Sequence, residues 1–165
     1  FTGFELAYRT PESWNPGGRI CAAYTYATIS SVTKQLLDPT KIISQQVIGE
    51  EVLTNDALSE IPPLEINVSA YYKFFNGKLV PRVACRMVLD QGHVSEAFYE
   101  KTTPGFVLLN LGLTYKYKSF LTLSGGVNNL LNTAYYEHLN RKMIGSTGRL
   151  YEPGRVLYAN VMFNF

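Results

Sequence analysis

The chain has 165 residues, enough for one soluble domain, and its formal net charge of +2 is too small to imply a nucleic-acid partner. No stretch approaches the ~18 consecutive apolar residues that a membrane-spanning helix needs. Mean hydropathy is close to zero although 13% of the residues are aromatic. This combination suits a membrane β-barrel, in which only alternate residues face lipid, and it also suits a soluble β-sandwich.

Apolar and polar residues alternate along seven runs of the chain, which is the pattern of strands with one apolar and one polar face. The runs cover 1–10, 19–29, 64–74, 79–90, 106–117, 120–127 and 154–165. In the clearest run, Ile66, Val68 and Tyr72 oppose Glu65 and Lys73. No helical periodicity competes over these runs, so the sequence predicts an all-β, antiparallel fold.

The connections between the runs are short and long in strict alternation. The short ones are 11–18, Asn76-Gly77 and Lys118-Ser119, and the long ones are 30–63, 91–104 and 130–153. Asn-Gly is the strongest hairpin signal, because both central residues of a type I′ turn need positive φ. Outer-membrane barrels have short periplasmic turns and long extracellular loops. The alternation therefore predicts a transmembrane β-barrel portion whose last strand ends at the periplasmic rim.

Charged residues lie opposite the apolar face of several runs: Glu65, Lys73, Arg82, Arg86 and Lys116. In a small barrel with a packed interior these charges would be buried at high cost. In a wide barrel they line water or pair with a plug domain. Pro81 lies in the apolar register of the fourth run, where its missing N–H predicts a bulge or a local distortion.

The long connection over 30–63 is rich in apolar residues, which suggests that it folds against its neighbours or covers the barrel mouth, with a short helix as one way to do so. Glu50, Glu51 and Asp56 within it are interpreted as a solvated face. Gly125 and Gly126 fall inside a strand run and indicate close packing or a bend.

Signals for catalysis or for a bound metal are weak. Cys21 and Cys85 lie far apart and show no metal-ligand spacing, which favours free thiols. No motif places serine, histidine and aspartate as a triad, and no glycine-rich phosphate loop follows a strand. The sequence therefore predicts neither an enzyme nor a cofactor.

The segment Gly126-Val-Asn-Asn-Leu-Leu-Asn-Thr-Ala-Tyr-Tyr-Glu-His-Leu139 resembles the late asparagine-leucine-tyrosine motif of TonB-dependent outer-membrane receptors. Glu152-Pro-Gly-Arg155, Tyr158 and the terminal Phe165 are similar to the last strand of that family. The resemblance implies about seven C-terminal strands of a roughly 22-stranded plugged barrel. Residues 1–165 would then form the C-terminal segment of one barrel domain, with the plug and the earlier strands outside this chain.

The resemblance also implies a function, which is active import of a scarce nutrient across the outer membrane of a Gram-negative bacterium. Iron chelates, haem and cobalamin are the family's usual cargo. The implied partners are the rest of the barrel and its plug, the TonB complex, the barrel-assembly machinery and membrane lipid, with a surface lipoprotein as a further candidate. An outer-membrane barrel enzyme or adhesin is the alternative, and a soluble β-sandwich is the third interpretation.

Substrate contact and a purely structural role both stay open for the candidate loop residues His93, Tyr99, Tyr135, Tyr136, His138 and Arg141. Part of this set belongs to the family motif, whose implied role is to turn the strand end and to bury a tyrosine against the barrel wall. The resemblance further implies that the alternating apolar residues of the last run form the barrel-insertion signal: Leu157, Val161, Phe163 and Phe165. Strand addition at an open edge would be its physical basis.

Overall fold

The computed structural model describes residues 1–38, 40, 46–140 and 149–163, and within them it has nine β-strands and no α-helix. The strands are β1 (Thr2–Arg9), β2 (Gly17–Tyr26), β3 (Thr28–Leu37), β4 (Val47–Ala57), β5 (Glu65–Tyr71), β6 (Leu79–Val88), β7 (Phe106–Tyr117), β8 (Leu121–Asn128) and β9 (Val156–Phe163). The prediction of an all-β fold is confirmed.

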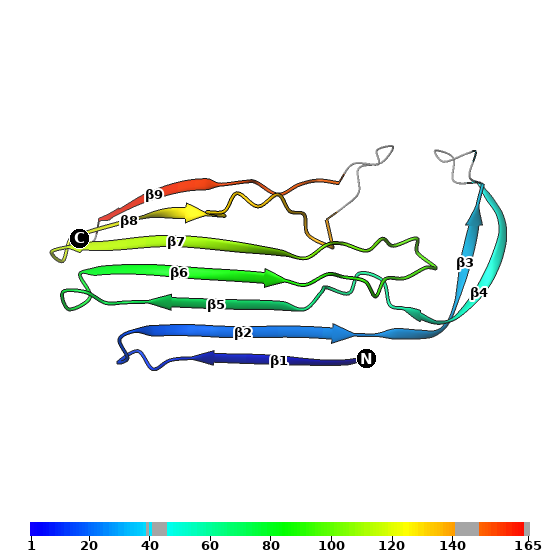
Figure 1. Ribbon diagram of the computed structural model, residues 1–165, viewed down its shortest axis with the longest axis horizontal. Helices are drawn as coiled ribbons and strands as arrows, with labels where there is room; N and C mark the ends of the chain where they lie inside the picture. Colours follow the sequence, from blue (N-terminus) through cyan, green and yellow to red (C-terminus); the bar gives the residue numbers. More distant parts are fainter. Residues whose placement is uncertain (39, 41–45, 141–148, 164–165) are drawn as a thin grey trace.

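Seven of the strands form one antiparallel sheet in the order β1-β2-β5-β6-β7-β8-β9 (Figure 1). These are the seven runs of the sequence pattern, and each pairs with the next run along the chain. β3 and β4 form a separate two-stranded hairpin between β2 and β5. The sheet is open in this chain, because β1 and β9 lie at its two edges.

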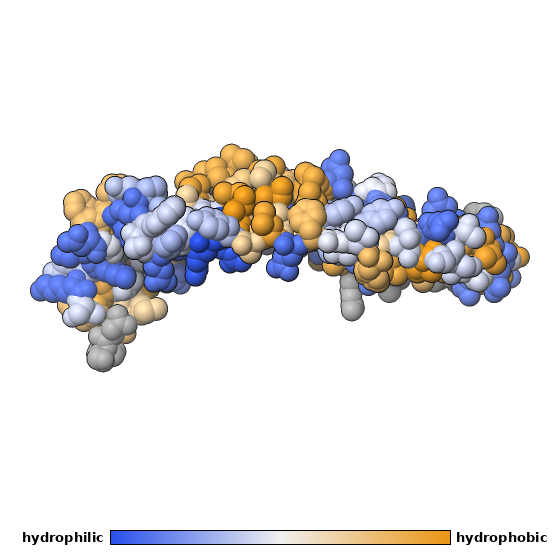
Figure 2. All heavy atoms as spheres, turned by 90° about the horizontal axis from the view of Figure 1, so that it is seen from below, coloured by the Kyte–Doolittle hydropathy of each residue, from blue (hydrophilic) through white to orange (hydrophobic). Residues whose placement is uncertain are grey.

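The register of the sheet keeps apolar residues beside apolar residues across all seven strands. Ile20 pairs with Tyr8 and Val68, and Val83 pairs with Ala70 and Leu111 in the same way. Seen edge-on in Figure 2, the apolar side chains gather over the middle of the convex side, and hydrophilic ones occupy the concave side. A one-residue slip of any strand would exchange these faces, so the alternation itself fixes the register.

The apolar convex face is exposed although it carries many large side chains, among them Leu113 at 48% and Val161 at 61% of full exposure. An apolar surface this extensive marks a site of interaction with lipid or protein. β2, β6 and β7 have 10, 10 and 12 residues, which reaches the ~9–11 residues that a tilted strand needs to cross a bilayer. A soluble β-sandwich would bury this face, so the interpretation as a soluble domain fails.

Over the residues described, the structure contains no helix with the length and apolar character to traverse a bilayer.

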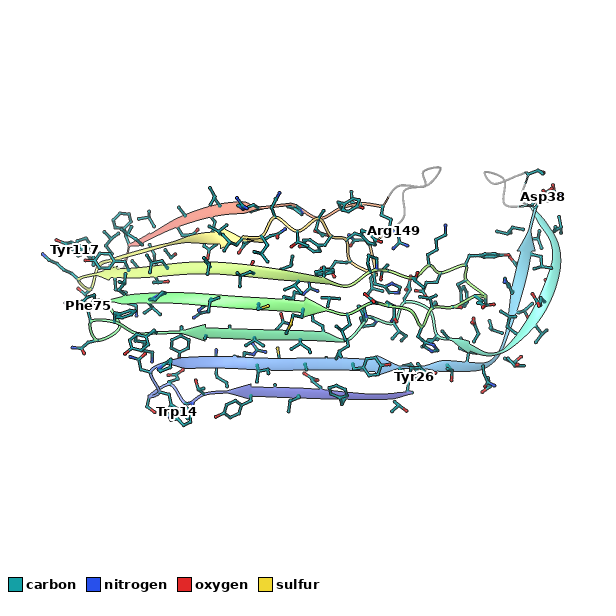
Figure 3. All side chains as sticks on the ribbon, viewed as in Figure 1. Trp14, Tyr26, Asp38, Phe75, Tyr117 and Arg149 are labelled. Atoms are coloured by element: carbon teal, nitrogen blue, oxygen red, sulfur yellow. The ribbon has the colours of Figure 1, made fainter. Side chains whose placement is uncertain are left out.

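Short turns and long loops lie at opposite ends of the sheet, as the alternation predicted (Figure 1). Trp14, Phe75 and Tyr117 mark the short-turn end in Figure 3. The first turn is tied to the neighbouring strand, because the Asn15 side chain donates to the Lys73 carbonyl (2.9 Å) and accepts from the Lys73 N–H (2.7 Å).

The hairpin between β5 and β6 forms where it was predicted, with Asn76 and Gly77 at the centre of its turn. Phe75, Asn76 and Gly77 all have positive φ (52°, 55° and 80°), and the Gly77 N–H donates to the Phe74 carbonyl (3.0 Å). The Lys78 N–H donates to the Phe75 carbonyl (3.2 Å) and so encloses Asn76 and Gly77, while Phe74 bridges Leu79 across the turn. The prediction of a turn centred on Asn76-Gly77 is confirmed, within a four-residue loop over 75–78.

Pro81 produces no bulge, because the register of β6 with β5 and with β7 runs through this region without a shift. The N–H of Tyr72 donates to the Pro81 carbonyl (3.2 Å), but Pro81 has no N–H to return the bond, and β5 ends at Tyr71. The local distortion expected at Pro81 therefore takes the form of an early end to the pairing between β5 and β6.

The segment 30–63 holds most of the β3–β4 hairpin, and its described residues contain no helix. The suggestion of a short helix was wrong for this part of the chain. Val47, Ile48 and Val52 are exposed, so these apolar residues do not pack onto neighbouring loops as expected. Both strands contain several β-branched residues, which suits an extended hairpin better than a helix.

Gly126 allows a tyrosine to lie flat on the concave face. Its register partner is Tyr158, and a Cβ at position 126 would meet the Leu111 carbonyl and the Tyr158 hydroxyl. The neighbouring Gly112 leaves room for the same hydroxyl, which a Cβ there would approach to 3.2 Å. The interpretation of this glycine as a point of close packing is confirmed.

We predict that Gly126→Ala lowers the folded fraction of the full-length protein in the outer membrane. The added methyl must displace backbone as well as the Tyr158 ring, and such overpacking costs about 1–3 kcal/mol. Heat-modifiable mobility on a denaturing gel measures the folded fraction. Gly92→Ala is the matched control, because a Cβ at position 92 meets no atom within 4 Å. Equal folded fractions for the two variants would contradict the packing argument.

Candidate functional site

The segment after β8 turns sharply because two asparagines adopt positive φ, Asn129 at 51° and Asn132 at 54°. The Asn129 side chain closes the turn by donating to the Thr133 carbonyl and accepting from the Thr133 N–H (2.9 Å each). The Asn132 side chain accepts the Arg155 N–H (3.0 Å). Asparagine tolerates this backbone conformation better than other residues with a Cβ. The asparagines of the motif thus fold the chain back over the sheet.

Tyr135 then packs onto the concave face. Its ring lies 4.5 Å from that of Phe106, above a small core of Phe106, Val88 and Leu108. The expected tyrosine thus lies against the barrel wall, where it is half-buried. Burial, with the Glu152 and Glu137 carboxylates nearby, raises the pKa of the Tyr135 hydroxyl, so it stays a neutral phenol.

Folding back places Glu137 beside the sheet. Arg86 of β6 donates through Nη1 to Glu137 Oε1 (2.5 Å) and through Nη2 to Glu65 Oε2 (2.7 Å). Glu65 also accepts from the Asn67 side chain (2.6 Å). The sequence pattern predicted that Glu65 and Arg86 share the polar face, but it missed Glu137, whose position depends on the path of a loop.

A hollow of about 540 Å³ lies on the concave face around this ion cluster. Its charged lining comes from Glu5, Arg19, Glu65, Arg86 and Glu137. Two carboxylates share one guanidinium here, so the hollow has both donors and acceptors for a polar occupant.

At the long-loop end, Asp56 joins the base of the β3–β4 hairpin to the loop 91–104. Its carboxylate accepts from the Ser95 hydroxyl (2.6 Å) and from the N–H groups of Glu96 (3.0 Å) and Ala97 (3.1 Å). Asp56 is only 8% exposed and Ser95 is fully buried. The interpretation of Asp56 as part of a solvated face was wrong, because the loop donates three hydrogen bonds to it, whereas Glu50 and Glu51 are exposed as expected.

Burial raises the pKa of the Asp56 carboxyl, but the hydrogen bonds from Ser95, Glu96, Ala97 and Ala57 together outweigh it and hold the pKa below its usual range. The carboxylate therefore remains ionised at neutral pH and anchors the loop.

His138 joins the loop 91–104 to the segment that carries the motif. Its Nε2 lies 3.1 Å from Glu100 Oε1 and its Nδ1 lies 3.0 Å from the Thr103 hydroxyl, with the histidine side chain 2% exposed. Glu100 also accepts the N–H groups of Ser95 and Glu60 (2.9 Å each). One carboxylate therefore ties three segments of the mouth together.

A second hollow, of about 410 Å³, opens at the long-loop end of the sheet, and we call it the mouth hollow. It is lined by Glu100, Lys101, Tyr136, His138 and Arg149 among others. The Arg149 guanidinium lies 4.6 Å from the centre of the Tyr136 ring. Cations, aromatic faces and a carboxylate thus border one opening, which suits a ligand with both aromatic and charged groups.

Two candidate residues are engaged in holding the loops. His93 stacks on Tyr26 (4.3 Å between ring centres), and its Nε2 lies 3.3 Å from the Ala27 carbonyl. The Tyr99 hydroxyl donates to the Gln35 carbonyl on the β3–β4 hairpin (2.6 Å). Tyr26 and Arg149 are labelled at this end of the sheet in Figure 3. Tyr136 and His138 are the two candidates that line the mouth hollow.

Arg141 and Phe165, also candidates from the sequence, lie outside the described residues. Leu157, Val161 and Phe163 of β9 project from the apolar face and are 75%, 61% and 58% exposed. Within the described residues, no group of three or more histidine, cysteine, aspartate or glutamate side chains could hold a metal ion. Cys21 and Cys85 are free thiols.

We predict that Asp56→Ala loosens the loop 91–104 locally. The substitution leaves buried donors on Ser95, Glu96 and Ala97 without their acceptor, at about 1–3 kcal/mol for each unsatisfied group. Hydrogen exchange of the Glu96 and Ala97 amides should accelerate markedly. Glu51→Ala removes an exposed carboxylate from the same strand and should leave both amides protected. Unchanged exchange in the Asp56 variant would refute the anchor.

The same anchor gives a prediction for pH. Because the folded-state pKa of Asp56 lies below the unfolded value, its stabilising effect is complete above the ordinary aspartate pKa of ~3.9. It is lost as the pH falls through the lowered folded value. Amide exchange, corrected for intrinsic rates, should show constant protection of Ala97 from neutral pH down to the ordinary aspartate pKa. Protection should then fall as the pH drops through the lowered pKa of Asp56 in the folded protein. Loss of protection near neutral pH would contradict this assignment.

Comparisons with known proteins agree with this architecture. The family model described as "TonB dependent receptor-like, beta-barrel" matches residues 1–130. No curated protein matches the chain. Among solved structures, the copper transporter OprC is similar with a TM-score of 0.71 and 22% identity, over 99% of this chain and 23% of that protein.

Two further structures share the fold. The FrpB iron transporter from Neisseria meningitidis (F3-3 variant) has a TM-score of 0.65 and 18% identity, over 96% of this chain and 23% of its own. The ferric enterobactin receptor PfeA from Pseudomonas aeruginosa, as a G324V mutant, has a TM-score of 0.60 and 17% identity, over 99% and 22%. The chain thus spans less than a quarter of the length of these proteins.

The fold matches barrel portions of these transporters. Its short turns and long loops lie at opposite ends of the sheet, which is the arrangement of outer-membrane barrels, whose short turns face the periplasm. The family places the protein in the outer membrane of a Gram-negative bacterium. The match over residues 1–130 shows that the chain belongs to the TonB-dependent receptor family and forms part of its β-barrel.

Proposed function

We propose that the protein containing this chain imports a scarce nutrient across the outer membrane, driven by the TonB complex acting through a plug domain. The chain supplies part of the barrel wall and three extracellular connections. The observation that carries this proposal is the family match, supported by the seven-stranded sheet with an apolar convex face and a charged concave face. The transporters of this family are not enzymes, and the proposed function of this protein is transport.

A complex of a metal ion is the cargo class that the neighbours favour. OprC is described as a copper transporter, FrpB as an iron transporter and PfeA as a receptor for ferric enterobactin. The described residues offer no cluster of metal ligands, so the proposed cargo is a chelate recognised through its organic groups. Iron chelates, haem and cobalamin are therefore the candidates to test first.

Tyr136 is the proposed substrate contact, because it lines the mouth hollow with Lys101 and Arg149. His138 also borders this hollow, but its side chain is 2% exposed and is held by Glu100 and Thr103, so we propose that it positions the loops. His93, Tyr99 and Tyr135 are engaged in contacts within the chain, and we propose that they position the loops. An outer-membrane barrel enzyme or an adhesin is the second candidate function. It lacks a supporting observation, since the Ser95 hydroxyl donates to Asp56 and the His138 side chain, which contacts Thr103 and Glu100, is only 2% exposed.

The transport proposal is tested by growth. A strain that lacks the full-length gene should fail to grow when one metal complex is the sole iron or cobalamin source, and the intact gene should restore growth. Normal growth of the deletion strain on every iron chelate, on haem and on cobalamin would overturn the proposal.

Substrate contact is tested with Tyr136→Ala in the full-length receptor. Loss of the ring removes the contact with Arg149 and a face on which an aromatic group of the cargo can stack. Loss of such stacking costs about 1–3 kcal/mol of binding free energy, which is a roughly fivefold or larger loss of affinity. Tyr99→Phe is the control, because it removes only a hydroxyl bound to the Gln35 carbonyl. Equal cargo binding by the Tyr136 variant and the intact receptor would exclude this contact.

We also propose that Leu157, Val161, Phe163 and Phe165 carry the signal for barrel assembly. Support comes from the common apolar face of Leu157, Val161 and Phe163 on β9, an edge strand of the described sheet. Deleting Phe165 should lower the amount of assembled receptor, measured as the heat-modifiable form in outer-membrane fractions. Unchanged assembly would count against the signal.

A further inference from the structure

One short segment of the chain borders two hollows at once. Residues 137–140 line the mouth hollow on one side. On the other side they line the hollow of about 540 Å³ on the concave face, which we call the inner hollow. We call this segment the partition, because it separates the opening among the loops from the space beside the barrel wall. It follows Tyr136 directly in the chain, so the contacts that fix the partition also place the Tyr136 ring.

Polar contacts hold the partition in place. Its single apolar residue, Leu139, is 54% exposed and so gives it little apolar anchorage. His138 is held by the loop 91–104 through both of its ring nitrogens. The Asn140 side chain donates to Glu152 Oε1 (2.8 Å). Both contacts tie the partition to other loops of the mouth and not to the sheet.

One side chain ties the partition to the strands. Among the hydrogen bonds of the described residues, Arg86 of β6 is the strand residue whose side chain reaches the partition. Its Nη1 donates to Glu137 Oε1 (2.5 Å) and its Nη2 to Glu137 Oε2 (3.2 Å). Two such contacts fix the orientation of a carboxylate as well as its position. Arg86 lines the inner hollow and not the mouth hollow, so it acts on the mouth through Glu137.

The guanidinium has a second partner, which makes this tie releasable. Arg86 Nη2 also donates to Glu65 Oε2 (2.7 Å), so two carboxylates compete for one nitrogen. If Glu137 leaves, Arg86 keeps Glu65, and the large cost of an unpaired, partly buried guanidinium does not arise. Arg19 lines the same hollow, is exposed and forms no ion pair with other described residues, so a released Glu137 has a cation nearby.

The contact is also accessible to water. The side chains of Arg86 and Glu137 are 27% and 30% exposed, so water can replace the hydrogen bonds that they lose on release. Ion pairs of this kind shift an equilibrium by roughly fivefold, which holds a segment in place without locking it.

We propose that Arg86 is a positioning residue that keeps the partition closed between the mouth hollow and the inner hollow, and that Glu65 makes this contact releasable. This inference rests on the proposed function, in which the cargo enters through the mouth. It is supported by the place of the partition between two hollows, by its one tie to the strands and by the sharing of the guanidinium. The closed partition presents Tyr136 to the mouth and shields the inner hollow.

Cys21 is a natural reporter for the partition, because it is a free thiol that lines the inner hollow and not the mouth hollow. The test is the rate at which a charged, membrane-impermeant maleimide labels Cys21 in intact cells that carry the full-length receptor, without cargo. Mass spectrometry identifies the labelled peptide. Cys85, the other thiol of the chain, pairs with Val68 and Leu109 in the apolar rows, where lipid keeps the reagent away.

Arg86→Gln should raise the labelling rate of Cys21 roughly fivefold, which is the effect of losing a half-exposed ion pair. Glu137→Gln should raise it as well, because it removes the same contact from the partition side. Arg82→Gln is the matched control, because it removes an arginine from the same strand and face that forms no ion pair with the described residues. Unchanged labelling in the Arg86 and Glu137 variants, or an equal rise in the Arg82 variant, would overturn the proposal.

Glu65→Gln distinguishes positioning from general stability. It removes the competing carboxylate and leaves the guanidinium to Glu137, so labelling of Cys21 should stay at the rate of the intact receptor or fall below it. If Arg86 only stabilised the sheet, the Glu65 and Glu137 variants would both raise the rate, and that result would contradict a positioning role. Each rate is normalised to the folded fraction from heat-modifiable mobility, so a variant that assembles poorly still gives a result.

The labelling assay is independent of transport. It needs neither cargo nor the TonB complex, so a receptor that fails to restore growth on metal complexes still reports the state of the partition. Equal labelling in all variants would remove the role of Arg86 and leave the transport proposal standing.

Discussion

The structure depends on one constraint, which is that the apolar rows of seven strands stay in register across the whole sheet. Val127 between Leu111 and Leu157 shows the pattern at one edge, and Ile20 between Tyr8 and Val68 shows it at the other. The described chain has only a small core, at Val88, Phe106 and Leu108, and that core lies on the concave side. Lipid on the convex face therefore replaces the protein interior that holds a soluble sheet together. The concave face is then free to carry charges that a packed core would exclude.

Most of the sheet was predictable because strand alternation is a local property of the sequence. The seven runs, their pairing and the two ends followed from residue period and loop length. Errors arose where backbone chemistry or distant partners decide. At Pro81 the missing N–H shortened β5 without shifting the register. The β3–β4 hairpin was missed because a short apolar segment does not distinguish a strand from a helix by periodicity alone.

The candidate site was less predictable than the sheet, because its geometry is set by loops that meet in space. Residue type and loop position suggested His138 and Tyr135, but nothing local indicated that one lies on Glu100 and the other on Phe106. Asp56 was misjudged for the same reason, since its three donors come from residues about 40 positions away.

The buried contacts of the mouth also bear on how it could bind a ligand. Asp56, Glu100 and His138 cross-link the hairpin base, the loop 91–104 and the motif segment through short hydrogen bonds. Loops held in this way lose little conformational freedom when a ligand binds, so more of the contact energy appears as affinity. The same contacts remove several polar side chains from the set that can touch a ligand. Recognition then depends on the few groups that border the mouth hollow, chiefly Tyr136 and Arg149. Because Tyr136 is not part of the hydrogen bonds that hold the loops, replacing it tests substrate contact without removing them.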